Sequence, residues 1–422
     1  MLAGSVAACG GGGGGSAPAG GFSNTPVTPA PTTAPTSTPT STPQQPPLAS
    51  SQLHVPTGFE ARVIANVGGA RELAALPNGD LIVGTSGTTI AIVPGAENAG
   101  VAGSAATFAT LDDAPAQGVA YGGGFVFVAS QHGVWRIPYA SGQQTGTPQK
   151  IASVRTGPVA PNSDGDVHTT SSVAVSGSTL YVGVGSSCNA CTEVDPTRAT
   201  VQRMNLDGSG MTTQATRWRN AMAFTTDPSS GTVWAGGAGQ DDLPAGHPYE
   251  FMDDVSAHAA PADYGWPQCE ENRVGYVSGA RCSEVVPAIE FPAYSTIIGA
   301  AFYPASQGGA YAFPTAWRGG IYASMHGSWH TNASNVPVDP PHVAFVPFSG
   351  TQPARPVNWS DPTTQWNDFF TGFQDGSGSR IGRTTGAAVG PSGSLFVADD
   401  QTGNIYRIRP TGASTSAVRR GR

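Results

Sequence analysis

Residues 118–129, GVAYGGGFVFVA, contain the pattern that decides the fold, because two short β-rich runs flank a turn of three glycines. Related stretches are SVAVSGSTLYVG at residues 172–183 and GAAVGPSGSLFVA at residues 386–398. Two such runs around a glycine-containing turn are typical of a β-hairpin. A hairpin of this size is not stable alone, so the copies must pack against one another to bury their faces.

Three further copies of the pattern occur. They are ELAALPNGDLIVG at residues 72–84, AMAFTTDPSSGTVWAG at residues 221–236, and a looser copy divided between residues 299–304 and 320–324. Repeats of about 40–50 residues with such hairpins are typical of propeller blades, and longer gaps require inserted loops. A two-sheet sandwich is the structural alternative, but it does not predict a repeated motif. We therefore expect an all-β protein with a six-bladed β-propeller over residues 51–412.

The composition agrees with an all-β chain and excludes several classes of partner. Charged residues make up 11% of the 422 residues, while glycine (57) and proline (36) are abundant. This composition disfavours long amphipathic helices and favours short strands with many turns. The net charge is −8 and no basic stripe is visible, so nucleic acid is not an expected partner. No stretch approaches the roughly 18 apolar residues of a membrane-spanning helix.

The two ends of the chain differ from the repeats. Val6-Ala7-Ala8-Cys9 matches the bacterial lipobox, so residues 1–9 are expected to end a lipoprotein signal, with Cys9 lipidated. The alternative is a chance match in an alanine-rich leader. Residues 10–50 are almost wholly Gly, Ser, Thr, Pro, Ala and Gln, which predicts a disordered tether. Residues 413–422 are expected to be a flexible basic tail, and the protein to be exported to the periplasm or outer membrane.

The remaining cysteines are Cys188, Cys191, Cys269 and Cys282. An even number of cysteines in an exported chain indicates disulfides, and sequence proximity favours Cys188–Cys191 and Cys269–Cys282. A Cys-x-x-Cys pair can also serve redox chemistry or zinc binding. No second Cys-x-x-Cys or nearby histidine pair completes a zinc set, so structural bridges are favoured.

Polar residues precede the first strand of several repeats, where inner strands of a propeller begin. His168 precedes the third copy and is a candidate general base, because its unperturbed pKa lies near working pH. The alternative is a loop histidine that only forms hydrogen bonds. The same register carries Gln117, Arg219, Asn220 and Arg383. Two arginines there suit a ligand with carboxylates, although each arginine alone is more often a surface residue.

Two further segments offer candidates near the same channel mouth. His326 belongs to the cluster His326-Gly-Ser-Trp-His330 in the fifth repeat, which could equally be ordinary loop packing. The segment 236–250 is acidic and rich in glycine and proline, and Gly239, Asp241 and Asp242 lie within it. Calcium takes carboxylate and backbone carbonyl oxygens, which flexible loops supply, although EF-hand spacing is absent.

Several ordered motifs resemble the glucose/sorbosone dehydrogenase family, six-bladed propellers that use pyrroloquinoline quinone and calcium. They include HTTSSVAV from residue 168, RNAMAF from residue 219, DYGWPQC at residues 263–269, HGSW at residues 326–329 and GRTTGAAVG from residue 382. The resemblance covers roughly residues 52–410. It departs from the family at Ser171 and Ser172, where an arginine often follows the histidine, at Val167, and in the lack of a lysine for the quinone site.

The resemblance implies a mechanism. His168 would take a hydroxyl proton while hydride passes to the quinone, and Arg219, Asn220 and Arg383 would hold the quinone's carboxylates and carbonyls. Gln117 and His326 are further expected cofactor contacts, and the 236–250 loop would hold Ca²⁺. The implied partners are a small sugar or alcohol and a periplasmic electron acceptor, with the membrane reached only through a lipid anchor.

Two other functions remain open at this point. One is a calcium-dependent lactonase-like hydrolase, which would need a cluster of channel-facing carboxylates. The other is a non-catalytic surface-binding propeller.

Overall fold

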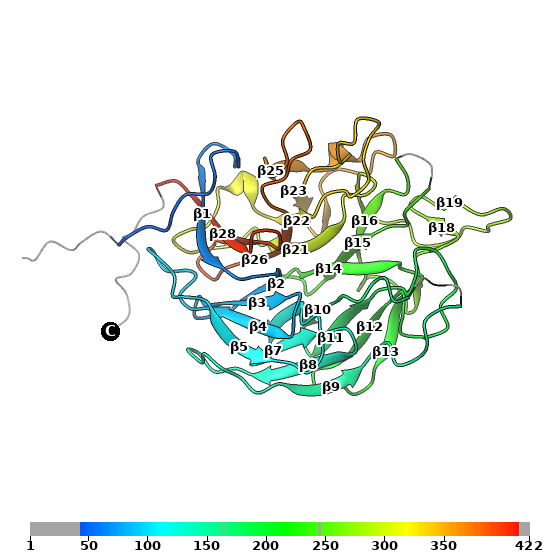
Figure 1. Ribbon diagram of the computed structural model, residues 1–422, viewed down its shortest axis with the longest axis horizontal. Coiled ribbons are helices and arrows are strands. Elements are labelled where there is room, and N and C mark those ends of the chain that lie inside the picture. The colour runs from blue at the N-terminus through cyan, green and yellow to red at the C-terminus, as the bar shows by residue number, and fades with distance from the viewer. Residues whose placement is uncertain (1–42, 162, 164, 244–245, 413–422) are drawn as a thin grey trace, which may run out of the picture. The chain divides into compact units, whose positions relative to one another are not determined.

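Six sheets of four or five strands surround a central axis in the part of the chain that the structure describes (Figure 1). The structure is a computed structural model that describes residues 43–161, 163, 165–243 and 246–412. The expected six-bladed β-propeller is confirmed. The lipobox with Cys9, the tether before residue 43 and the basic tail after residue 412 lie outside the described residues.

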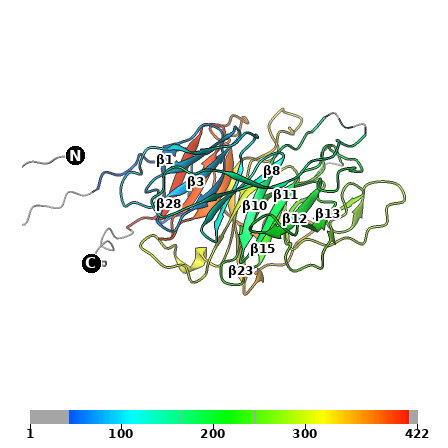
Figure 2. The ribbon, with the colours of Figure 1, turned by 90° about the horizontal axis from the view of Figure 1, so that it is seen from below.

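The first three blades follow the chain in order. The first consists of β2 (Ala70–Ala75), β3 (Leu81–Thr85), β4 (Thr89–Val93) and β5 (Ala106–Thr110). The second consists of β6 (Gly118–Gly122), β7 (Phe125–Ala129), β8 (Gly133–Pro138) and β9 (Gln149–Ser153). The third consists of β10 (Ser171–Ser176), β11 (Thr179–Val184), β12 (Thr200–Asn205), β13 (Thr212–Thr216) and β17 (Ala262–Asp263), and its first four strands lie side by side in Figure 2.

The fourth and fifth blades contain the long insertions. The fourth consists of β14 (Asn220–Thr226), β15 (Val233–Ala238), β16 (Glu250–Asp254) and β20 (Ile289–Phe291). Its insertion carries the hairpin β18 (Cys269–Glu270) and β19 (Val274–Gly275). The fifth consists of β21 (Ile297–Tyr303), β22 (Gly320–Met325), β23 (His342–Ser349), β24 (Gln352–Pro353) and β25 (Asn367–Phe370). The short 3-10 helices η1 (Thr315–Trp317) and η2 (Pro362–Gln365) lie in its loops, and no helix of the described chain could span a membrane.

The last blade joins the two ends of the described chain. It consists of β26 (Thr384–Val389), β27 (Leu395–Asp399), β28 (Asn404–Pro410) and β1 (Phe59–Asn66), so the first strand in sequence is the outermost strand of the final sheet (Figure 1). β1 and β28 are antiparallel, with Phe59 opposite Pro410. Residues 47–49, which we expected in the tether, lie along β1, since Val63 N donates to Pro47 O and Ala49 N to Ala61 O.

The inner strands form a closed ring. β2, β6, β10, β14, β21 and β26 contact one another in this order, and β26 returns to β2. Close approach of backbones explains the small residues of the repeat. A Cβ at Gly84 would lie 2.0 Å from Gln117 O of the next blade, and one at Gly386 would lie 2.3 Å from Arg71 O. Glycine is therefore required at these positions by the spacing between blades.

The hydrophobic core lies between the blades. Buried aromatic rings fill the space between the fifth and sixth blades, among them Phe59, Phe313 and Phe369. The structure also contains the disulfides Cys188–Cys191 and Cys269–Cys282, the pairing that sequence proximity favoured, with Cα–Cα distances of 6.1 and 5.6 Å. The first bridge lies in the loop between β11 and β12, and the second joins β18 to the loop that follows β19.

Candidate active site

A cavity of about 260 Å³ lies where the inner strands begin, at one end of the ring. Its polar lining includes Arg71, His168, Arg219, Asn220, Asp241 and His326. A second cavity of about 460 Å³ adjoins it, sharing His168, Arg219 and Asp241 and adding Cys188 and Asn189. A third cavity of about 350 Å³ lies at the other end of the inner strands, and its described lining contains no carboxylate, histidine or arginine. Among these three cavities, charged side chains therefore line only the first two.

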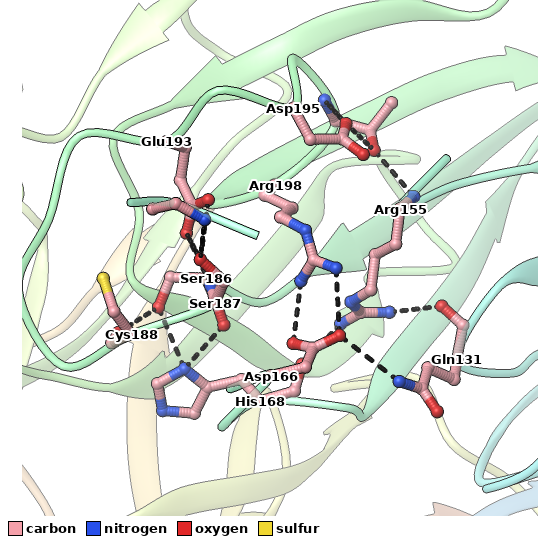
Figure 3. A network of polar contacts seen from close by, with 12 residues as sticks. Gln131, Arg155, Asp166, His168, Ser186, Ser187, Cys188, Glu193, Asp195 and Arg198 are labelled. Atoms are coloured by element: carbon pink, nitrogen blue, oxygen red, sulfur yellow. Dashed lines mark hydrogen bonds and ion pairs between the residues drawn. The ribbon is translucent and has the colours of Figure 1, made fainter. Parts of the chain in front are cut away.

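The tautomer of His168 is set by its neighbours (Figure 3). Nδ1 lies 3.0 Å from Ser186 O and 2.9 Å from Ser186 Oγ. The carbonyl oxygen can only accept, and the hydroxyl already donates to Cys188 O at 2.7 Å. Nδ1 must therefore carry the proton, which leaves the Nε2 lone pair available. No described residue forms a hydrogen bond with Nε2.

His168 is neutral in this setting. Burial, assisted by the nearby Arg219 guanidinium, lowers the pKa of His168 to about 3, against the raising effect of the Ser186 hydrogen bond. Loss of hydration disfavours the imidazolium, and a neighbouring cation acts in the same direction. The imidazole is therefore unprotonated at physiological pH, with the Nε2 lone pair free to accept a hydrogen bond.

The backbone around His168 is held by two buried arginines (Figure 3). Arg155 donates to the carbonyl oxygens of His168 and Thr170, at 2.9 and 2.6 Å, and to Ser171 Oγ at 2.6 Å. Arg198 forms a bidentate ion pair with Asp166, with N–O distances of 2.7 and 2.9 Å. Arg155 thus places a cation beside Ser171, where the family that the sequence resembles often has an arginine, but here the cation binds backbone oxygens and the Ser171 hydroxyl. The histidine segment is fixed on both sides.

Arg219 belongs to a second network. Its Nη2 donates to Asp241 Oδ2 at 2.6 Å and to Asn189 Oδ1 at 3.0 Å, and its Nε donates to Asn189 O at 3.2 Å. The other oxygen of Asp241 lies 3.0 Å from His330 Nε2. Arg219 is only 5% exposed, so this carboxylate partner compensates a buried cation.

A third network joins the first, second, fifth and sixth blades. Arg71 donates to Gln117 Oε1 at 3.0 Å and to Asp400 Oδ2 at 2.7 Å. His326 Nε2 lies 3.0 Å from Asp400 Oδ1. Burial lowers the pKa of His326 to about 4, although Asp400 opposes this shift. Arg383 donates to His326 O and to Gly327 O, at 3.1 and 3.0 Å.

The remaining polar groups of the cavity carry little charge. Asn220 Oδ1 is buried without a hydrogen-bond partner among the described residues, which leaves it available to a ligand. Glu250 is 3% exposed, and burial raises its pKa well above the usual range, so it is neutral. The lining thus carries Arg71, Arg219 and Asp241 as its charged residues, while Asp400 pairs with Arg71 from outside the lining.

Aromatic rings form one wall of the mouth. The Tyr294 and His330 rings stack with centroids 3.8 Å apart, and the Trp329 and His330 rings lie 3.9 Å apart. Tyr294 and Trp329 line the cavity, and Trp329 is 66% exposed. An exposed indole beside a polar cavity offers an apolar surface to a ligand ring.

The acidic loop does not form a ready calcium site. Both carboxylate oxygens of Asp241 are engaged, Asp242 is exposed, and Gly239 lies against Pro248. Among the described residues, the clusters of three potential ligand side chains each contain a disulfide pair. These residues do not fit a calcium ion as they stand, because one would have to displace Arg219 or His330 or rely on backbone oxygens.

The structure brings some predicted site residues together and separates others. His168, Arg219, Asn220, Asp241 and His326 line one cavity. Gln117 and Arg383 do not line it, but they contact Arg71 and the His326 backbone respectively.

Sequence reasoning missed Arg71, Asn189, Tyr294 and Asp400. Arg71 is the exception that a signal could have revealed, because it directly precedes the first repeat in the register of Gln117 and Arg219. The others lie in loops, where the repeat gives no register.

Comparisons with known proteins agree with the fold. A family model described as TrAA12-like matches residues 267–411. No curated protein sequence matches the chain. The holo form of the pyranose dehydrogenase PQQ domain from Coprinopsis cinerea is 18% identical, with a TM-score of 0.69, over 86% of this chain and 98% of that one.

Two further solved structures have the same fold. A calcium structure of a Trichoderma reesei carbohydrate-active enzyme of family AA12 is 18% identical, with a TM-score of 0.68, over 88% of this chain and 100% of that one. The PQQ-bound aldose sugar dehydrogenase from Streptomyces coelicolor is 18% identical, with a TM-score of 0.54, over 84% of this chain and 99% of that one. At these identities the likeness establishes a shared propeller fold.

Proposed function

We propose that the chain is an exported quinoprotein-type oxidoreductase that oxidises a sugar or a related alcohol, with pyrroloquinoline quinone as its cofactor. The observation that carries the proposal is the state of His168: a neutral ring with Nδ1 donating to Ser186 and Nε2 unpaired beside Arg219. The names of the similar propellers support the same class of reaction.

The cavity offers groups that suit this quinone. The carboxylates of the quinone would approach Arg71 and Arg219, since guanidinium pairs with carboxylate in a planar, bidentate geometry. Asn220, whose amide oxygen lacks a partner, would meet one of its polar edges. The two adjoining cavities together have the size of ordinary ligand pockets, about 300–1,000 Å³. When bound, the quinone supplies an acceptor for hydride, that is, for two electrons and one proton.

The chain's own residues handle the substrate's other proton. The substrate hydroxyl donates to His168 Nε2, and its proton moves to that atom as the C–H hydride leaves the same carbon. The carbon is oxidised to a carbonyl, which is a lactone when the substrate is an aldose. Ser186 O and Oγ accept from Nδ1 throughout, so they orient the ring and stabilise the positive charge that develops on it.

Reconstitution tests the proposal. The purified protein is titrated with pyrroloquinoline quinone by calorimetry, with and without Ca²⁺, and dye reduction is followed with a panel of aldoses and alcohols. His168→Ala should abolish dye reduction while quinone binding survives. The matched control is His132→Ala, which removes an exposed histidine paired with Asp113.

The alternatives give different results. Quinone binding without turnover of any substrate would favour a binding propeller, and lactone hydrolysis without quinone would favour a hydrolase. Absence of both quinone binding and dye reduction would refute the proposal, and full activity of His168→Ala would refute the assigned base.

The proposal includes a location. The lipobox motif at Cys9 supports a lipid anchor, with the tether holding the propeller in the periplasm or at the outer membrane. Mass spectrometry of the mature N-terminus tests this, because a diacylated cysteine at position 9 is expected and an unmodified Met1 would exclude it.

A further inference from the structure

The disulfide Cys188–Cys191 closes a four-residue loop at the side of the cavity, and Asn189 lies inside this loop. Its side chain connects Arg219 and Asp241. Asn189 Oδ1 accepts from Arg219 Nη2 at 3.0 Å and from the Asp241 backbone N–H at 2.8 Å. Asn189 Nδ2 donates to Asp241 O at 3.0 Å. Both ends of one amide are therefore used to hold the arginine and its carboxylate partner together.

The backbone of Asn189 is used as well. Its carbonyl oxygen accepts from Arg219 Nε at 3.2 Å and from Trp266 Nε1 at 3.0 Å. The indole of Trp266 is 3% exposed and packs against Cys188, so the loop rests on a rigid surface. Asn189 thus takes part in five hydrogen bonds. It lies within the four-residue loop that the Cys188–Cys191 bridge closes, and the bridge restricts rotation of the backbone there.

The same loop is also connected to His168, through Ser186. Cys188 O accepts from Ser186 Oγ, and this contact fixes the hydroxyl as an acceptor for His168 Nδ1. One covalent ring therefore orients both polar sides of the site: His168 through Ser186, and Arg219 through Asn189.

We propose that Asn189 is a positioning residue for the Arg219–Asp241 pair, and that the Cys188–Cys191 bridge is required to keep it in place, so that reducing the bridge weakens ligand binding in the cavity. The ligand and the reaction rest on the proposed function, whereas the positioning of Asp241 by Asn189 does not. Reduction by dithiothreitol converts the bridge to two thiols and leaves the reagent as its cyclic disulfide. In the reduced loop Asn189 gains backbone freedom, and Arg219 is no longer held at two of its nitrogens.

Three variants and one reduced form test the proposal. They are Asn189→Ala, Asn189→Asp, the paired Cys188→Ser/Cys191→Ser, and Cys269→Ser/Cys282→Ser treated with dithiothreitol so that only one bridge is reduced. Untreated Cys269→Ser/Cys282→Ser is the matched control. It keeps the Cys188–Cys191 bridge and lacks only the Cys269–Cys282 bridge, whose cysteines do not line the cavity. Near-ultraviolet circular dichroism verifies that each form is folded.

Two readouts separate positioning from general stability. Hydrogen exchange of the Asp241 amide, followed by mass spectrometry, should accelerate in Asn189→Ala and in both forms without the Cys188–Cys191 bridge. Asn189→Asp should recover most of the protection, since a carboxylate oxygen still accepts from this N–H. The quinone dissociation constant should rise about 10- to 100-fold in Asn189→Ala, by analogy with the loss of affinity when residues that orient metal ligands are removed. The control should match the wild type in both measurements.

Each outcome has a defined meaning. Wild-type protection of the Asp241 amide in Asn189→Ala would overturn the proposal, whatever happens to affinity. Unchanged protection in both bridge-free forms would overturn the role of the disulfide. If the wild type binds no quinone, the proposed function fails and the exchange experiment still decides the role of Asn189. If Cys188→Ser/Cys191→Ser does not fold, the reduced form supplies the same comparison.

Discussion

Substitution Glu72→Gln should change how the stability of the propeller depends on pH. Glu72 lies on β2 and is 6% exposed, and its Oε1 has no hydrogen-bond partner among the described residues. Burial raises the pKa of its carboxyl from 4.5 to about 8, although the neighbouring Arg71 lowers it. The group therefore stays protonated in the folded protein where it would ionise in the unfolded chain.

The magnitude follows from linkage. Below pH 4.5 the carboxyl is protonated in both states and imposes no pH-dependent cost. Between pH 4.5 and about 8 the unfolded chain releases the proton and the folded protein keeps it, so stability falls by about 1.36 kcal/mol per pH unit. The total loss approaches about 5 kcal/mol above pH 8. Glutamine has the same shape and no charge to bury, so Glu72→Gln should lose none of this stability.

Urea unfolding of both proteins from pH 4.5 to pH 9 measures the difference. The free energy of unfolding of Glu72→Gln relative to wild type should rise steadily with pH and level off above pH 8. Other buried carboxyls with raised pKa values, such as Glu250 and Glu290, affect both proteins equally and cancel in the difference. Asp112→Asn is the control, because Asp112 is exposed. A difference between Glu72→Gln and wild type that does not change with pH would refute the reasoning.

Three other predictions follow from the contacts described above. Arg219→Gln should raise the pKa of His168 from about 3, because it removes the cation that assists burial in lowering this pKa. Titration of the histidine ring nitrogens by NMR measures the shift, and an unchanged pKa would contradict the effect assigned to Arg219. Gly84→Ala should destabilise the fold by about 3 kcal/mol or more, since its Cβ would meet Gln117 O. The Cβ of Gly87→Ala meets only a hydroxyl at 3.8 Å, so this variant should be tolerated. Equal stability of the two variants in thermal unfolding would be inconsistent with this reasoning. Removal of residues 1–66 should leave β28 as an exposed edge. The shortened protein should then aggregate or lose cooperative unfolding, as followed by size-exclusion chromatography and calorimetry. A monomer with wild-type stability would argue against the role of β1.

The six blades could be predicted because each hairpin is encoded locally. Alternation of apolar residues and a glycine turn fall within about a dozen residues of each other, as at residues 118–129. The position of β1 could not be predicted in this way, because its partner β28 lies at the other end of the chain. Residues 47–49 lie close to β1 in the sequence, but their composition matches that of the expected tether and gives no signal of the contact.

The candidate site was predicted where the register sufficed. His168, Arg219 and Asn220 precede or begin inner strands, and all three line the cavity. Arg383 has the same register, yet its guanidinium binds the backbone of the loop that follows β22. Register places a Cα, whereas the direction of a long side chain depends on which acceptors surround it.

Loop residues were harder to predict. Asp241 was proposed as a metal ligand from its acidic surroundings, but its oxygens meet Arg219 and His330. Arg219 directly precedes β14 of the same blade and His330 follows β22 of the fifth blade, and the sequence offers no signal that connects either residue with Asp241. Asn189 likewise acquires its importance from the bridge around it and from Arg219, 30 residues away.

Pairing of β1 with β28 also determines the order in which the ring can be completed. A ribosome makes β1 first and β28 last, so β1 has no strand to join until nearly the whole propeller has been synthesised. During that interval it presents an unpaired edge that another nascent copy can capture. At high concentration, refolding should therefore yield dimers in which each copy completes its last blade with the first strand of the other.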